Sequence, residues 1–157
     1  MASVPKLTVD EALWAHHEGK FDVAFRALSY WAAQGDASAF TMLGYMYDAG
    51  QGTRKNKAKA KYWYEKAYAA GESIAASNLA TIYRDARRPA LELAWYKRAA
   101  ELGDGDALVE VGIRYLSGKG TRRNPAMAEK CFAAALRSKN ITEAGRDTAQ
   151  QLVWGLK

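Results

Sequence analysis

Two adjacent histidines, His16 and His17, are the residues of this chain whose type is most typical of metal binding. A zinc site needs three or four nitrogen, sulfur or oxygen ligands that converge on one ion. Neighbouring side chains on a helix point about 100° apart, so this pair is poorly placed to share an ion. The sequence has no other histidine and one cysteine. We therefore expect a structural or surface role for the pair and no metal site.

Cys131 is the one candidate for a thiol nucleophile. A catalytic thiol needs a base that activates it, and the sequence suggests no such partner. The Gly-x-Gly turns at Gly50 and Gly118 lack the preceding strand and the later glycine of a dinucleotide site. The carboxylates are scattered over predicted helix faces without a convergent pair. We expect no catalytic residue, no cofactor and no enzymatic activity.

The composition of the 157 residues fits a helical protein that can bury a core, since 49% are hydrophobic and only three are proline. The formal net charge of +6 favours partners with an acidic face. The single cysteine allows no internal disulfide, and the first residues lack the features of a signal peptide. No window approaches the roughly 20 apolar residues of a membrane span. We expect a cytoplasmic monomer without a transmembrane segment.

Small and aromatic residues recur along the chain at a spacing that indicates stacked structural units. The first half of the unit is represented by Ala39, Leu43, Gly44, Tyr47, Gly50 and Gly52, then by Ala107, Val111, Gly112, Tyr115, Gly118 and Gly120. A degenerate copy contains Ala75, Leu79, Ala80 and Tyr83. The second half is represented by Ala60, Trp63, Tyr64 and Ala67, by Trp95, Tyr96 and Ala99, and by Ala128, Cys131, Phe132 and Ala135.

Each unit is predicted to form two antiparallel helices, because its apolar residues follow the i, i+3, i+4, i+7 spacing of a buried helical stripe. Gly44 in mid-helix predicts close approach of another helix, since glycine there otherwise costs up to about 1 kcal/mol. Gly50 should end the first helix of its unit, and Asn56 and Asn124 should each cap the second helix of their units. Trp63 and Trp95 are expected in the core between helices.

The predicted architecture is all-α, a right-handed solenoid of antiparallel helix pairs with a C-terminal capping helix. The pairs are expected at about 8–35, 36–71, 72–103 and 104–139, and the cap at about 141–155. The middle pair has a shorter inner loop, in which Pro89 starts the next helix. No linker or low-complexity stretch interrupts the pattern, so residues 1–157 are predicted to form a single domain.

The motif Ala-x-x-x-Leu-Gly-x-x-Tyr-x-x-Gly-x-Gly, followed by Ala-x-x-Trp-Tyr-x-Lys-Ala, resembles the Sel-one-like repeat (SLR), an α/α solenoid class related to the tetratricopeptide repeats. Residues 39–67 match it best. The resemblance implies an adaptor or scaffold from a bacterium. Such a protein binds other proteins, mostly on the concave surface lined by the first helix of each pair. Because it includes stand-alone bacterial proteins that neutralise toxins, it also implies a narrower alternative, an immunity-type inhibitor of a secreted toxin.

The positions between the packing residues of each first helix are the predicted partner-binding surface. The residues chosen there are Tyr45, Asp48, Ser77, Thr81, Arg84 and Ile113. The same predicted surface becomes apolar at Val109, Ile113 and Leu116 of the last pair, and exposed apolar surface usually marks a contact. The alternative is that the C-terminal helix folds over these three residues.

Basic residues crowd the inner loops and are predicted to form a ridge: Arg54, Lys55, Lys57, Arg87, Arg88, Arg122 and Arg123. This basic ridge could dock an acidic protein face, or attach to nucleic acid or an anionic surface, which is the alternative function. It could equally be a solvated edge that keeps a solenoid in solution. Nucleic acid is disfavoured because the regular aromatics are assigned to packing, which leaves few to stack on bases.

Overall fold

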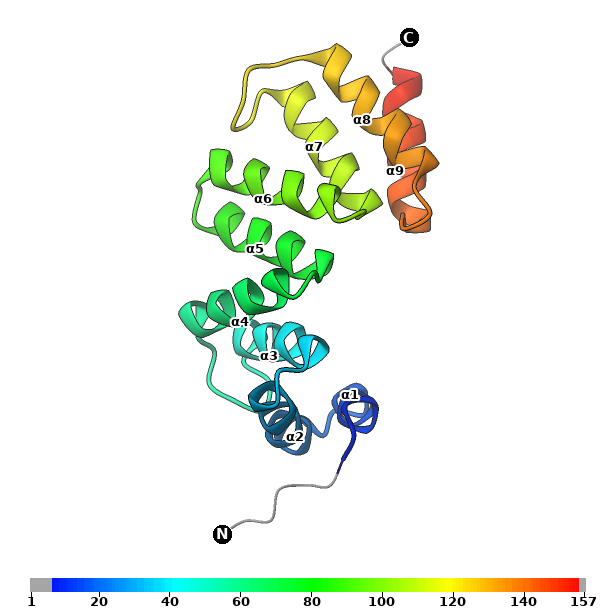
Figure 1. Ribbon diagram of the computed structural model, residues 1–157. Helices are drawn as coiled ribbons and strands as arrows, with labels where there is room; N and C mark the ends of the chain where they lie inside the picture. The colour runs from blue at the N-terminus through cyan, green and yellow to red at the C-terminus, as the bar shows by residue number, and fades with distance from the viewer. Residues whose placement is uncertain (1–6, 156–157) are drawn as a thin grey trace. The chain divides into compact units, whose positions relative to one another are not determined.

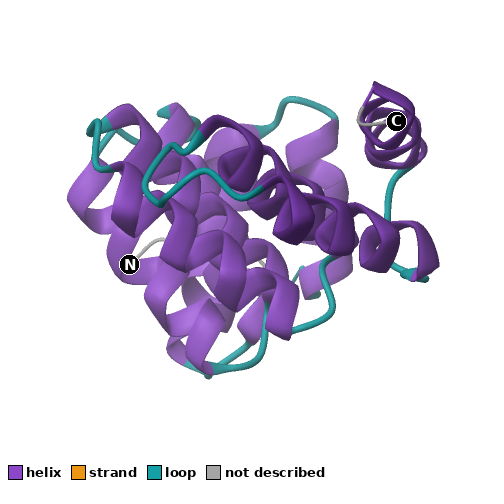
Figure 2. Cartoon of the chain, turned by 90° about the horizontal axis from the view of Figure 1, so that it is seen from above, coloured by secondary structure: helices purple, strands orange, loops and turns teal. Residues whose placement is uncertain are grey.

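The computed structural model describes residues 7–155, and all regular structure within them is α-helical (Figure 1). Figure 2 shows the same chain from above as helices joined by short loops. In chain order the helices are α1 (Val9–His17), α2 (Phe21–Ala33), α3 (Ala37–Ala49), α4 (Lys57–Ala69), α5 (Ser73–Asp85), α6 (Pro89–Glu101), α7 (Gly105–Ser117), α8 (Pro125–Arg137) and α9 (Glu143–Gly155). Among the described residues, none of these helices combines the length and the apolar character needed to cross a membrane.

The helices begin and end at the capping residues that were predicted from the sequence. The Asn56 side chain accepts a hydrogen bond from the backbone N–H of Lys59 and so caps α4. Asn124 does the same at the start of α8. Gly50 follows α3 with φ of 76°, a left-handed conformation that glycine adopts without strain. Pro89 is the first residue of α6.

Close helix crossing explains the mid-helix glycines. A Cβ atom added at Gly44 would overlap the ring of Tyr64, and one at Gly112 would overlap the ring of Phe132. Both rings are buried, at 1% and 0% exposure. The predicted close approach is therefore confirmed: α4 lies against α3, and α8 against α7, at these glycines.

The chain divides into two compact units, residues 1–75 and 76–157. In unit 1 the largest fully buried side chains are those of Leu28, Leu43, Met46 and Tyr64. In unit 2 they include Leu79 and Phe132. The prediction of a single domain over the whole chain stays a prediction.

The two tryptophans of the repeat differ in burial. Trp95 is 9% exposed, as expected for a core residue. The prediction is wrong for Trp63, which is half-buried. One face of the Trp63 ring stacks on Phe40 at 5.7 Å between centroids, and the ammonium of Lys66 lies 6.0 Å from its centroid. Trp63 therefore covers the core from outside instead of filling it.

The C-terminal helix covers the apolar end of unit 2. Ala149 of α9 is fully buried in a cluster with Val109 of α7 and Phe132 of α8. Ile113 and Leu116 pack against the same cluster, and so do Leu152 and Val153 of α9. Figure 1 shows α9 beside α7 and α8. Of the two alternatives left open for this apolar line, the structure shows the covered one.

Candidate functional site

Tyr45 is the most exposed aromatic residue of α3, at 44%, and its ring is held in place from α1. The edge of the ring meets the imidazole of His16 at 5.7 Å between centroids. Nε2 of His16 is hydrogen-bonded to Oε1 of Gln51 at 2.7 Å, and its ring also contacts Phe21 at 5.1 Å. His16 therefore has the structural role that was expected, and it positions an accessible tyrosine.

Asp48 lies one turn after Tyr45 on α3 and forms an ion pair with Lys57, the first residue of α4, at 2.6 Å between Oδ1 and Nζ. The Asp48 side chain is 25% exposed and that of Lys57 is 44% exposed. One residue predicted for the partner surface and one predicted for the basic ridge are thus brought together. The pair reduces the positive charge that unit 1 presents at Lys57.

In unit 2, two of the predicted partner residues are engaged within the fold. The hydroxyl of Ser77 donates to Oδ2 of Asp104 at 2.7 Å, while Oδ1 of Asp104 caps α7 at Ala107. Ile113 packs against the cluster that α9 completes. Ser77 is therefore placed as a positioning residue for the α7 cap, and Ile113 as a packing residue. The role of Ile113 is the covered alternative given for this residue, whereas the bond from Ser77 was not anticipated, because it depends on a contact between helices.

Thr81 and Arg84 are the predicted partner residues that unit 2 leaves accessible on α5. Thr81 is half-buried, and its hydroxyl donates to the carbonyl oxygen of Asn78. Arg84 is exposed and lies 3.9 Å from the carboxylate of Asp85. Arg84 is therefore a charged side chain at the surface whose ion pair with Asp85 is long and exposed, so little free energy is lost when Arg84 turns toward a partner.

The residues of the predicted basic ridge are all exposed, but they belong to both units. In unit 2, a Cβ atom at Gly120 would overlap the carbonyl of Pro89, so the loop carrying Arg122 and Arg123 lies against the start of α6. Arg87 and Arg88 immediately precede that start. The guanidinium of Arg123 donates through Nε to the carbonyl of Leu116 at 3.0 Å. Two loops of unit 2 thus place basic residues near one another.

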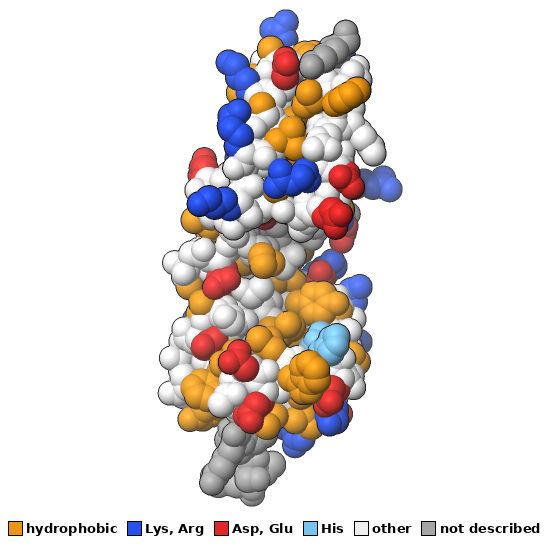
Figure 3. Space-filling model, turned by 90° about the vertical axis from the view of Figure 1, so that its right-hand side faces the viewer, with side chains coloured by type: hydrophobic (Ala, Val, Ile, Leu, Met, Phe, Trp, Pro, Cys, Tyr) orange, Lys and Arg blue, Asp and Glu red, His pale blue; other side chains and the backbone are white. Residues whose placement is uncertain are grey.

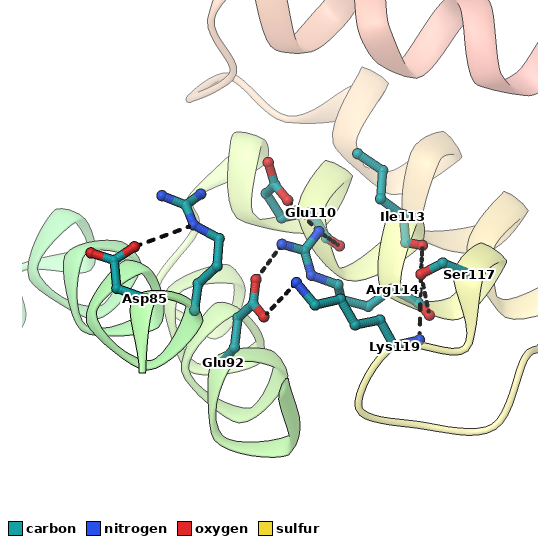
Figure 4. A network of polar contacts seen from close by, with 8 residues as sticks. Asp85, Glu92, Glu110, Ile113, Arg114, Ser117 and Lys119 are labelled. Atoms are coloured by element: carbon teal, nitrogen blue, oxygen red, sulfur yellow. Dashed lines mark hydrogen bonds and ion pairs between the residues drawn. The ribbon is translucent and has the colours of Figure 1, made fainter. Parts of the chain in front are cut away.

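A buried ion-pair network between α6 and α7 was not found by sequence reasoning (Figure 4). Nη2 of Arg114 donates to Oε1 of Glu92 at 2.5 Å, and Nη1 donates to Oε2 of Glu110 at 2.6 Å. Nζ of Lys119 lies 3.2 Å from Oε2 of Glu92. The side chain of Glu92 is 0% exposed and that of Arg114 is 8% exposed. The expectation that no two carboxylates converge is wrong at this position, because Glu92 and Glu110 both contact Arg114.

A signal for this network was present in the repeat alignment. Glu92 occupies the position held by alanine in the other three pairs, at Ala24, Ala60 and Ala128, all of which are fully buried. Arg114 occupies the position of Met46, which is also fully buried. Two charges of opposite sign that replace two buried apolar residues in adjacent helices would have indicated a pair.

The surroundings of Glu92 and Arg114 shift each pKa in the direction that favours the charged form. Burial by itself raises the pKa of Glu92, but the hydrogen bonds and charges of Arg114 and Lys119 outweigh it and lower the pKa. Burial by itself lowers the pKa of Arg114, and the hydrogen bond to Glu92 and the charge of Glu110 raise it above its usual value. The network is therefore a charged contact and holds no group poised for proton transfer near neutral pH.

The remaining candidates for chemistry are isolated. Cys131 is half-buried, and burial raises the pKa of its thiol, while the charge of Lys97 lowers it by a smaller amount. A raised pKa disfavours the thiolate that a nucleophile needs. Within residues 7–155, no group of three or more histidine, cysteine or acidic side chains could hold a metal ion.

Comparison with known proteins identifies the repeat family. A family model described as Sel1 repeat matches residues 37–72, 93–104 and 105–140. An ERAD-associated E3 ubiquitin-protein ligase component, HRD3B of Arabidopsis thaliana, is 30% identical over 115 residues, which are 68% of this chain and 17% of that protein. The chain therefore spans less than a fifth of the length of this curated relative.

Two solved structures have a similar fold. A protective antigen of uropathogenic Escherichia coli that displays an SLR fold gives a TM-score of 0.80, at 22% identity, over 92% of this chain and 31% of that chain. A Sel1 repeat protein from Oxalobacter formigenes gives a TM-score of 0.74, at 27% identity, over 84% of this chain and 54% of that chain. These likenesses confirm the predicted all-α solenoid fold.

Proposed function

The chain belongs to the Sel1 repeat family, and from that premise we propose that it is a non-catalytic adaptor or scaffold that binds another protein. Proteins of this family generally mediate protein–protein interaction. The proposal includes a cytoplasmic location and a monomeric state, which cell fractionation and sedimentation would test. Its partner surfaces are the accessible faces of the first helices, around Tyr45 in unit 1 and around Thr81 and Arg84 in unit 2.

The observation that carries this proposal is that the side chain of Tyr45 is exposed and yet held in one position. Its ring is 44% exposed, yet its position is determined by the contact with His16. A tyrosine already held in place loses little conformational freedom when a partner covers it, and tyrosine is enriched among the residues that dominate binding energy. Asp48, one turn away, adds a carboxylate that is paired but accessible at 25%.

The experiment is an affinity capture from lysate of the source cells, with and without nuclease, in which the wild type is compared with a Tyr45→Ala, Arg84→Glu variant by mass spectrometry. We expect the wild type to retain a nuclease-resistant protein partner and the variant to lose it. The purified pair should then show a Kd at least about 10-fold weaker for the variant.

The matched control is Tyr30→Ala with Lys139→Glu, which removes another exposed tyrosine, at 43%, and reverses another exposed charge. This control should bind like the wild type, and circular dichroism should show all three proteins folded. Equal binding by the wild type and the Tyr45→Ala, Arg84→Glu variant would refute the first-helix surface as the partner site.

A narrower form of the proposal is an immunity-type inhibitor of a secreted toxin. It requires a tight complex between equal amounts of this chain and a toxin, and loss of toxin activity in that complex. A gene for a secreted toxin beside the gene for this chain would supply the protein for a direct binding and inhibition assay. A purified neighbouring toxin that neither binds nor is inhibited would exclude this form while leaving the adaptor proposal intact.

A second candidate function rests on the basic ridge, because two loops of unit 2 place Arg87, Arg88, Arg122 and Arg123 near one another. In this function the chain attaches to nucleic acid or to an anionic surface. Binding to a labelled RNA or to anionic vesicles should fall steeply with salt and disappear when Arg87 and Arg122 are replaced by glutamate. Binding that is insensitive to both changes would exclude the ridge.

A further inference from the structure

A groove of about 540 Å³ runs along the first helix pair, and none of the predicted site residues lines it. Its apolar wall contains Leu7, Trp14, Ala15 and Val23, from α1, α2 and the residue before the α1 cap. Trp14 is 63% exposed, although tryptophan is usually covered in folded proteins. A large exposed aromatic beside an apolar groove usually marks a contact surface.

The rim of this groove is acidic, in contrast to the net charge of +6 of the whole chain. Three carboxylates line the groove, those of Asp10, Glu11 and Glu18, against the single ammonium of Lys20. Lys20 donates to Glu18 at 2.7 Å, and this contact holds the pKa of the Glu18 carboxyl below its usual value. Figure 3 shows acidic, hydrophobic and histidine side chains next to one another on one face of unit 1.

The same chain shows how the apolar side of a helix pair is covered. In unit 2, α9 lies against α7 and α8 and buries Ala149, with Leu152 and Val153 packed against the same cluster. The cover is thus one amphipathic helix that presents an apolar stripe to a helix pair. Among residues 7–155, no helix covers the α1–α2 groove in this way, as the 63% exposure of Trp14 shows.

We propose that the α1–α2 groove binds an amphipathic helix of a partner protein, with aliphatic side chains against Trp14 and lysine or arginine side chains over the acidic rim. A helix is the fitting form because the backbone groups of α1 and α2 are paired within their own helices and offer no edge for an added strand. The positive flanks follow from charge complementarity with Asp10, Glu11 and Glu18.

This surface shares no lining residue with the Tyr45 and Arg84 surfaces, so the inference goes beyond the proposed function and does not rest on it. It also assigns the opposite charge to the partner, since the basic ridge favours an acidic protein and this groove favours a basic one. A protein with both surfaces can hold two different partners at once, which is what a scaffold requires.

The test uses a synthetic helical peptide of about 18 residues with leucine at i, i+3, i+4, i+7 spacing and lysine elsewhere. Calorimetry measures its affinity for the full chain, and amide chemical shifts locate the binding site. We expect binding, with shifts concentrated in α1 and α2, and a Kd at least about 10-fold weaker for Trp14→Ala. The Asp10→Asn, Glu18→Gln variant should bind more weakly and with a smaller dependence on salt.

The matched controls are Trp154→Ala, which removes a tryptophan that is 81% exposed on α9, and Asp147→Asn on the same helix. Both should bind the peptide like the wild type. The Tyr45→Ala, Arg84→Glu variant should also bind it normally, which separates this inference from the proposed function. A second peptide with glutamate in place of lysine should not bind.

Four outcomes would overturn the inference. They are the absence of peptide binding at about 1 mM, equal affinity for the wild type and Trp14→Ala, equal binding of the glutamate peptide, and chemical shifts outside α1 and α2. Sedimentation of the protein alone tests a second copy as occupant. Self-association that Trp14→Ala abolishes would assign the groove to another copy of this chain and would also overturn the inference.

Discussion

Replacing Glu92 by alanine and Arg114 by methionine together should leave unit 2 as stable as the wild type or more stable, whereas each single replacement should destabilise it. The double variant restores the residue types that the other repeats carry, namely the buried alanine of Ala60 and Ala128 and the buried methionine of Met46. This outcome would mean that the buried charges stabilise each other but are not required for the helices to pack.

The sizes of the single effects follow from what each replacement leaves behind. Arg114→Met leaves the fully buried Glu92 with only Lys119, at 3.2 Å, so the free energy of unfolding should fall by about 3–5 kcal/mol. Glu92→Ala leaves Arg114 its bond to Glu110 at 2.6 Å, so the loss should be smaller, about 1–3 kcal/mol. Replacing a whole buried pair by apolar residues is commonly neutral or stabilising by about 1–4 kcal/mol.

The assay is urea unfolding at pH 7, followed by far-UV circular dichroism, for the wild type, both single variants and the double variant. The coupling free energy from this cycle should be at least about 2 kcal/mol, because the two side chains are in direct contact. The slopes of the transitions should agree, which shows that the same surface unfolds in each case. Lys139→Glu, an exposed change outside the network, is the control and should change stability by less than about 0.5 kcal/mol.

A double variant that loses the sum of the two single losses would refute this reasoning. It would mean that Glu92 and Arg114 stabilise the protein separately, by contacts that alanine and methionine cannot replace.

Three more predictions concern single residues. The stability that Glu92 contributes should be present near neutral pH and should be lost as pH falls from about 4.5 through its lowered pKa. In urea unfolding at decreasing pH, the difference in unfolding free energy between the wild type and Glu92→Ala should therefore shrink. A difference that stays constant with pH would contradict the lowered pKa. Trp95→Ala should lower the free energy of unfolding by about 3–5 kcal/mol and Trp63→Ala by only about 1–3 kcal/mol, because Trp95 is 9% exposed and Trp63 is half-buried. Equal losses in denaturant unfolding would contradict this ranking. Arg87 has φ of 55°, so Arg87→Gly should relieve strain and stabilise by about 0.5–1 kcal/mol, whereas a lower Tm would show that the arginine side chain makes a stabilising contact.

Local features of the sequence were sufficient to predict where helices begin and end. Asn56 and Asn124 cap helices, Pro89 starts one and Gly50 ends one, because each acts on backbone groups within a few residues of itself. The crossing of helices at Gly44 was predictable for a related reason. A glycine inside a helix is unfavourable unless a neighbouring ring needs the space, and here Tyr64 takes it.

The predicted site residues could be placed on the right helices but not assigned the right neighbours. Ser77 was predicted to face a partner, yet its hydroxyl is bonded to Asp104, 27 residues away. Asp48 and Lys57 were predicted for different surfaces, yet they form one ion pair. A pattern within one helix shows which side chains share a face, but it does not show which side chain of another helix meets them.

The all-α repeat fold could be predicted from the amino-acid sequence, because helix ends and close crossings depend on residues near one another in the chain. The tertiary structure was needed to show which polar and aromatic residues remain accessible. It buried Glu92 against Arg114, covered Ile113 with α9, and left Tyr45 and Trp14 in solvent. The physical reason is that helix formation depends on neighbours in the chain, whereas exposure depends on which other helices lie against each face.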